Sequence, residues 1–341
     1  MPLAPLRLPK SLLSSYEYSI REANYFADKT SRVQYALDSR RPTLSLNLPP
    51  YVYALIAAFL FAVGAQLQAV GLAGMDSRNG TALGIASSAI CFWLVAPWFL
   101  EPSYFFNTAI LLFIGIGLIR PAISANLGTT GIRFLGPTLS GTLSSTGPVF
   151  GVALGVFWLG EKITAATAFG TAGIVGAIIL LSRQRSDIGT NWPVWALMLP
   201  IGAAIIRSFG HAVNKVGMGY IPDPYFATLI GFTTSALVTL SVQATESMRL
   251  SSQGKSGGLT LQGSGALWFM VGGIVYAIAV LSLNQALLIG EVVTVVPIVS
   301  CNPVFTMLLS VFVFQRETIN FRTLLALALV LPSVVLVVIL G

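Results

Sequence analysis

From Tyr51 to Gly341 the sequence is a series of apolar stretches, each about 20 residues long, separated by short polar breaks. A helix of about 20 residues spans the ~30 Å hydrocarbon core of a bilayer. Backbone groups that face lipid must be hydrogen-bonded within their own segment, so stretches of this kind are expected to be helices. We therefore predict an all-α polytopic membrane protein with about ten transmembrane helices, over residues 51–73, 81–100, 105–126, 135–158, 163–182, 194–216, 224–244, 266–288, 292–314 and 323–341.

The composition excludes the other broad protein classes. Hydrophobic residues make up 55% of the 341 positions and charged residues 9%, whereas soluble domains carry about 25% charged residues. A soluble enzyme with these proportions would expose a large apolar surface, and a disordered chain would be far more polar. The two cysteines, Cys91 and Cys301, lie within apolar stretches, so no disulfide framework is expected.

Residues 1–50 differ from the rest, because they hold seven Lys/Arg and four Asp/Glu residues and no apolar stretch of signal-peptide length. We interpret them as a polar basic N-terminal tail without a cleaved leader. A helix over roughly 13–37 resting on anionic lipid is the alternative. The net charge of +7 is spread over tail and loops, which favours attraction to membrane lipids and no nucleic-acid partner.

Two stretches 155 residues apart resemble each other: Gly147–Phe157 and Asn302–Phe312 share Pro-Val-Phe after the first residue and a final Val-Phe. Each is followed by a short acidic break and one further apolar stretch. We therefore predict a first five-helix repeat over 51–182, a linker over 183–192 and a second five-helix repeat over 193–341. An odd number of spans per repeat inverts the second repeat in the membrane, an arrangement typical of transporters that bind substrate at the midplane.

This pattern resembles the EamA type of the drug/metabolite transporter superfamily over roughly residues 51–341. The resemblance is carried by the segment Pro137–Leu159, with its Pro148-Val-Phe150 and the following Gly160-Glu161, and by Pro303-Val-Phe305 and Glu317; Arg316 departs from it, since glycine is common there. It implies ten helices, a central substrate cavity and alternating access. The family it points to includes exporters of amino acids and other metabolites.

Ionisable side chains within a span are costly unless they face a cavity or a partner. Arg207, His211 and Asn214 follow one another at i, i+4 and i+7, so they share one face of the sixth span. The residues that we expect to bind substrate are Arg207, His211, Asn214, Arg120, Gln68, Asn284 and Asn302. The alternatives are hydrogen bonds that only hold helices together and, for Arg120 and Lys215, side chains that extend to the lipid head groups.

No Asp or Glu lies firmly inside any predicted span, which argues against an exporter of cationic drugs. Arginine pairs well with carboxylates, so we expect a carboxylate-bearing or zwitterionic substrate such as an amino acid. We predict a secondary transporter, an exporter in the cell (plasma or inner) membrane, as a monomer or homodimer. No metal-ligand spacing is present, so no cofactor is expected. The alternatives to a transporter are a membrane-embedded enzyme and a channel or scaffold protein.

Three further expectations concern the helix ends and the orientation. Pro148, Pro303 and Pro332 could interrupt their helices and allow bending, and Glu161 is interpreted as part of a helix end. The resemblance and the charged tail favour a cytoplasmic N-terminus, whereas the Lys and Arg residues of the short loops favour the opposite orientation.

Overall fold

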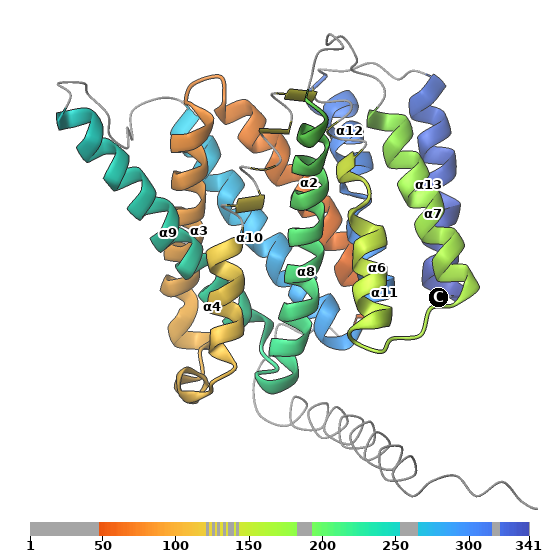
Figure 1. Cartoon of the computed structure of the whole chain (residues 1–341), viewed down its shortest axis with the longest axis horizontal. Helices are drawn as coiled ribbons and strands as arrows, with labels where there is room; N and C mark the ends of the chain where they lie inside the picture. The colour runs from red at the N-terminus through yellow and green to blue at the C-terminus, as the bar shows by residue number, and fades with distance from the viewer. Residues whose placement is uncertain are drawn as a thin grey trace, which may run out of the picture. The chain divides into compact units, whose positions relative to one another are not determined.

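The computed structural model describes residues 48–120, 143–182, 193–252, 265–315 and 321–340, together with a few positions between 123 and 140. From Pro49 onward they belong to one compact unit, Pro49–Gly341. The expected helix over 13–37 lies outside the described residues. Figure 1 shows a bundle of helices, and no strand occurs in the described part of the chain.

The described residues contain ten apolar segments that account for the ten predicted spans. In six of them the continuous apolar part is long enough to cross a bilayer, and in the other four that part is shorter. The long ones are α2 (Pro50–Gly71), α3 (Ser77–Phe99), α8 (Met198–Tyr220, preceded by the 3-10 turn Val194–Leu197), α9 (Pro224–Ser252), α10 (Gly265–Ile289), and α11 (Val292–Val299) with α12 (Asn302–Phe312). The shorter ones are α4 (Ile110–Ile119, after the 3-10 helix Pro102–Phe106), α6 (Gly147–Phe157), α7 (Ala165–Ser182) and α13 (Phe321–Leu340).

The helices pair as two inverted five-helix repeats. In the first repeat α2 packs against α10 and α12 of the second; correspondingly, α8, the first helix of the second repeat, packs against α4 and α6 of the first. The equivalent helices α3 and α9 contact each other, as do α7 and α13. This exchange of partners is expected when two repeats are related by a two-fold axis in the membrane plane.

The two repeated proline segments begin new helices, because each of the two predicted spans is interrupted just before its proline. Pro148 lies in the first turn of α6 and Pro303 in the first turn of α12. Each of these helices follows a two-residue turn, at residues 145–146 and 300–301. Proline fits the first turn because its missing N–H would have no helical partner there. Pro332, by contrast, lies inside α13.

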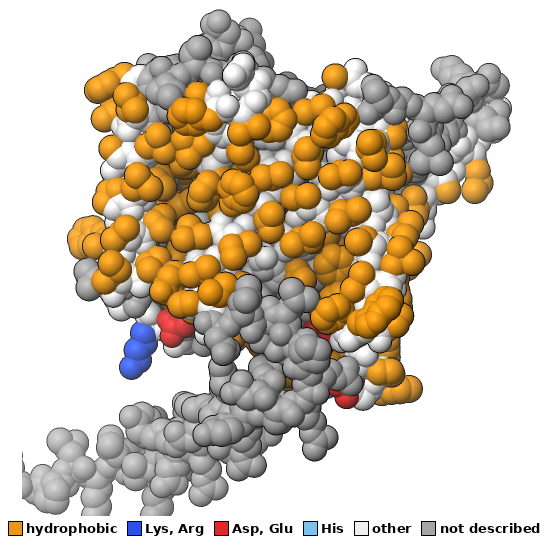
Figure 2. All heavy atoms as spheres, turned by 180° about the vertical axis from the view of Figure 1, so that it is seen from behind, with side chains coloured by type: hydrophobic (Ala, Val, Ile, Leu, Met, Phe, Trp, Pro, Cys, Tyr) orange, Lys and Arg blue, Asp and Glu red, His pale blue; other side chains and the backbone are white. Residues whose placement is uncertain are grey.

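The outer surface of the bundle is apolar, as lipid contact requires. Figure 2 shows hydrophobic side chains over most of one face, with described Lys, Arg, Asp and Glu atoms only towards one end. Large side chains such as Phe106 and Phe157 are about nine-tenths exposed. Inside, the helices approach closely at glycines: a Cβ added to Gly273 of α10 would lie 2.2 Å from the Gly84 carbonyl oxygen of α3.

Candidate functional site

A cavity of about 350 Å³ lies inside the bundle, between helices of both repeats. This is within the size range of pockets that hold small organic ligands. One part of its wall is apolar and is formed by Ile85, Ile116, Phe232, Val280 and Leu283. The other part is polar, and its described residues are Gln68, Ser77, Thr81, Ser88, Arg120, Asn214, Thr228, Ser235, Tyr276 and Asn284.

Arg120 follows the last turn of α4, and α9 holds it there. The single hydrogen of the Ser235 hydroxyl is shared between the carbonyl oxygens of Arg120, at 2.5 Å, and Gly117, at 2.9 Å. These bonds satisfy carbonyls that the end of a helix leaves free. The arginine therefore enters the cavity wall from a fixed backbone position.

The Arg120 side chain crosses α8 where Arg207 and His211 lie. Its Nη1 is 3.4 Å from the Arg207 carbonyl oxygen, to which it donates, and 3.4 Å from His211 Nδ1. Gly210 leaves the room for this crossing, because a Cβ there would lie 2.7 Å from Arg120 Cδ. Since arginine can only donate, His211 Nδ1 is the accepting nitrogen.

The two guanidinium groups form a positively charged region beside the cavity. The Arg120 guanidinium reaches the Arg207 carbonyl oxygen, so the two positive charges belong to the same part of the bundle. Among the described residues, neither arginine forms an ion pair with Asp or Glu. Positive charge concentrated in a low-dielectric wall attracts anions.

A chain of side-chain hydrogen bonds joins α8, α10 and α9 at the cavity wall. The Asn214 amide donates to Asn284 Oδ1 at 3.0 Å, and the Asn284 amide donates to Thr228 Oγ1 at 3.0 Å. The Thr228 hydroxyl in turn donates to the Pro224 carbonyl at 2.7 Å. All three side chains are buried, and buried amides are normally paired in this way.

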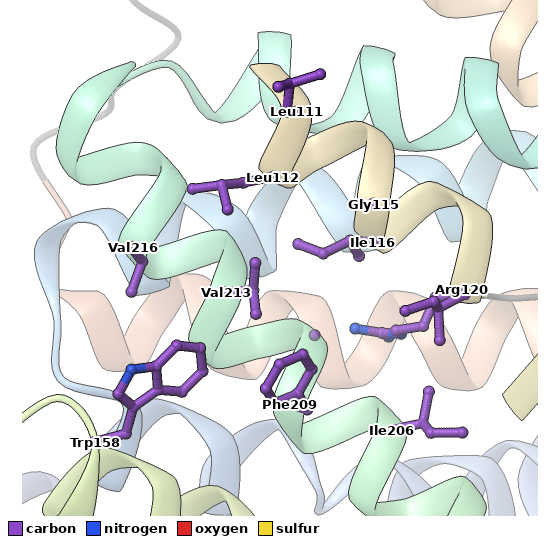
Figure 3. A pocket seen from close by; sticks show the side chains of 12 residues that line it. Leu111, Leu112, Gly115, Ile116, Arg120, Trp158, Ile206, Phe209, Val213 and Val216 are labelled. Atoms are coloured by element: carbon purple, nitrogen blue, oxygen red, sulfur yellow. The ribbon is translucent and has the colours of Figure 1, made fainter. Parts of the chain in front are cut away.

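A second hollow, of about 320 Å³, lies between α4 and α8 and is almost entirely apolar. Figure 3 shows Leu112, Ile116, Phe209 and Val213 around it, with Arg120 extending along one side. Ile116 and Arg120 line both hollows. The Arg120 side chain thus lies at the boundary between an apolar groove and the polar cavity.

Comparison with known proteins identifies the family. A model described as the EamA-like transporter family matches residues 48–183 and 194–339, one match to each repeat. The chain belongs to the EamA-like transporter family. It is therefore an integral multi-pass membrane protein and a transporter of small solutes. No curated protein matches the sequence significantly.

Solved structures show the same fold as this EamA-like transporter. One crystal structure superposes with a TM-score of 0.68, over 86% of this chain and 99% of the other. The sequence identity is 16%. A likeness at this identity concerns the fold alone.

The structure brings several of the predicted site residues of the EamA-like transporter together. Gln68, Arg120, Asn214 and Asn284 are among the residues that line the central cavity. Arg207 and His211 are half-buried next to Arg120 and are not among its described lining residues.

Asn302 lies apart from that group. It begins α12, and its carbonyl accepts from the Thr306 hydroxyl at 2.9 Å. The sequence analysis also missed the lining residues Thr228, Ser235 and Tyr276. Thr228 and Ser235 are spaced i, i+7, which puts them on one helix face, but single hydroxyl groups in an apolar stretch give little indication of function.

Proposed function

We propose that this transporter moves a small organic metabolite that carries a carboxylate, or is zwitterionic like an amino acid, by alternating access. The observation that supports the substrate class is the position of Arg120 on the wall of the central cavity. Its guanidinium has no carboxylate partner among the described residues. A substrate carboxylate would supply the missing negative charge, through paired hydrogen bonds that arginine is shaped to make.

The asparagines provide the second recognition element in this proposal. Asn284 uses one amide hydrogen for Thr228 and one lone pair for Asn214. Asn284 itself is fully buried, whereas Asn214 is 8% exposed and donates one amide hydrogen to Asn284. An amide side chain has two hydrogens and two lone pairs, so the remaining groups of Asn214 would contact a ligand in the cavity. The apolar wall formed by Ile85, Phe232 and Val280 would accommodate a hydrocarbon part of the substrate.

We further propose that the protein acts as an exporter in the cell membrane. The support is its resemblance to metabolite exporters, together with the inverted repeats on which alternating access depends. The described lining of the cavity contains no Asp or Glu that could exchange a proton for substrate. The mode of transport in this proposal is facilitated movement down the substrate gradient, or coupling that involves His211, which lies next to Arg120 outside the described lining.

The test is counterflow in vesicles that contain the purified protein, with labelled amino acids and small carboxylic acids as candidate substrates. Saturable exchange of labelled for unlabelled substrate supports a carrier, whereas flux that never saturates supports a pore. Arg120→Gln is expected to abolish or strongly reduce exchange of a carboxylate substrate. Unchanged exchange by this variant would remove the proposed substrate class.

A further inference from the structure

The central cavity differs at its two ends. Ser77 and Thr81, at the start of α3, line it and are exposed. Towards the opposite end of the bundle, Thr228 and Asn284 line it and are 1% and 0% exposed. We name the first of these the Ser77 end. We name the opposite one the Glu161 end, because the loop between α6 and α7, which carries Glu161, lies at that end of the bundle (Figure 1). Of the described residues that line the cavity, Ser77 and Thr81 alone are exposed, so the cavity is most accessible at the Ser77 end.

Glu161 joins the first repeat to the second at the closed end. It follows α6, and its carboxylate accepts the backbone N–H of Val292 and of Val293, each at 2.9 Å. These are the first two residues of α11. The N–H groups at the start of a helix have no helical partners, and this end of a helix carries a partial positive charge. A carboxylate is therefore favourable there, because it accepts hydrogen bonds from these N–H groups and is attracted by the charge.

Lys215 of α8 strengthens this contact. Its Nζ lies 3.4 Å from Glu161 Oε1, and it also donates to the Gly290 carbonyl just before α11. The Lys215 side chain is 26% exposed and that of Glu161 7%. Lys215 therefore does not extend to the lipid head groups, as the sequence alone suggested; it lies in a largely buried ion pair between the repeats.

The helix that precedes Glu161 is shaped for the same contact. A Cβ on Gly155 of α6 would lie 2.7 Å from Glu161 Oε2 and 2.7 Å from Val293 Cγ1. The Gly155 carbonyl also accepts the Glu161 N–H at 2.9 Å. Glycine at this position allows α6, the Glu161 carboxylate and α11 to come together.

We propose that Glu161, Lys215 and the first two amides of α11 form a latch, here called the Glu161 latch, that keeps the Glu161 end of the cavity closed. The inference rests on the proposed alternating access. Opening this end requires the loop after α6 to separate from α11, since one belongs to each repeat. Separation breaks both amide bonds and the ion pair, so the latch stabilises one of the two states and not the other.

The test measures from which side the cavity can be reached. Ala227 lines the cavity and is 3% exposed, so Ala227→Cys provides a reporter in a chain that also carries Cys91→Ala and Cys301→Ala. A membrane-impermeant maleimide is added to either side of oriented membranes, without substrate. In the parent, labelling is expected from the Ser77 end and to be slow from the Glu161 end.

Glu161→Gln and Lys215→Met are each expected to raise the labelling rate from the Glu161 end about tenfold, because each removes charge-assisted contacts of the closed state. Lys162→Gln is the matched control, as it removes a neighbouring exposed charge outside the latch, and should label like the parent. Gly155→Ala displaces the carboxylate without changing any charge, and should also raise the rate.

Unchanged labelling from the Glu161 end in folded Lys215→Met and Gly155→Ala proteins would overturn the latch, even if Glu161→Gln cannot be purified. A general loss of structure would raise labelling from both sides, so a rise confined to the Glu161 end supports it. Counterflow by the parent is measured separately. If labelling shifts as expected but the parent shows no saturable exchange, the proposed function fails and the latch remains.

Discussion

The side chains of Asn214 and Asn284 are joined by a 3.0 Å hydrogen bond that connects α8 to α10 at the wall of the central cavity. Asn284 is fully buried and also donates to Thr228. One amide thus joins three helices of the second repeat and holds Asn214 and Thr228, which line the cavity, in place. Its replacement should affect both stability and binding.

Asn284→Leu is expected to lower the free energy of unfolding by about 1–2 kcal/mol, because it leaves polar groups of Asn214 and Thr228 without partners in a buried place. Thermal unfolding of the purified protein in detergent measures this. The neighbouring Gln285→Leu is the control, since Gln285 is not among the described lining residues. Equal melting temperatures for the two variants would contradict the role assigned to the asparagine pair.

Arg120→Gln is expected to weaken substrate binding about 10- to 100-fold, the range for losing hydrogen bonds between charged groups. Arg207→Gln should weaken it less than about threefold, because that side chain can act on the ligand only over a distance. Affinity of the identified substrate for each purified variant is the measurement.

Gly210→Ala serves as an independent check on the arginine. A methyl group there would displace Arg120, since the added Cβ would lie 2.7 Å from its Cδ. We expect Gly210→Ala to weaken substrate binding more than Arg207→Gln does and less than Arg120→Gln does. A larger loss for Arg207→Gln than for Arg120→Gln would show that the binding group has been assigned to the wrong arginine.

The close approach of α3 and α10 gives a stability prediction. A Cβ on Gly273 would meet the backbone oxygen of Gly84 at 2.2 Å, and backbone cannot rotate away as a side chain can. Gly273→Ala is expected to cost about 1–3 kcal/mol of stability. Gly219→Ala, where a Cβ meets nothing within 4 Å, should be neutral or stabilise by up to about 1 kcal/mol. The melting temperatures should differ accordingly; a reverse order would refute the packing.

The inverted arrangement gives a labelling prediction. Three spans, formed by α7, α8 and α9, separate Lys162 from Ser252. Single cysteines introduced by Lys162→Cys and Ser252→Cys, in a chain without native cysteines, should therefore be labelled by an impermeant reagent from opposite sides. The same pair of results also decides which end is cytoplasmic. Labelling of both from one side would mean an even number of crossings between them.

The fold followed from the sequence because long apolar stretches in lipid have few alternatives to helices. The 155-residue repeat also indicated the two halves correctly. The proline positions were harder to interpret: Pro148 suits either a bend or a helix start, and only the turn at residues 145–146 decides which. A short turn inside an apolar stretch has no strong sequence signal.

The candidate site was harder to predict than the fold. Helical periodicity puts Arg207, His211 and Asn214 on one face of α8, but it does not say what lies opposite. In the structure Arg120 occupies part of that face, and it is Arg120 that lines the cavity. Gly210 was the available sequence signal for the position of Arg120. It lies between Phe209 and His211, and a glycine between two bulky residues of a helix can leave room for a side chain from another helix.

The carboxylate that completes the start of α11 comes from the other repeat. A fragment that begins at residue 194 would leave those two N–H groups without this acceptor and Lys215 without its counter-charge. Neither copy of the duplicated unit is therefore self-sufficient at this end. Each repeat completes its hydrogen bonding here with a side chain of the other, so a change in either one is felt in both.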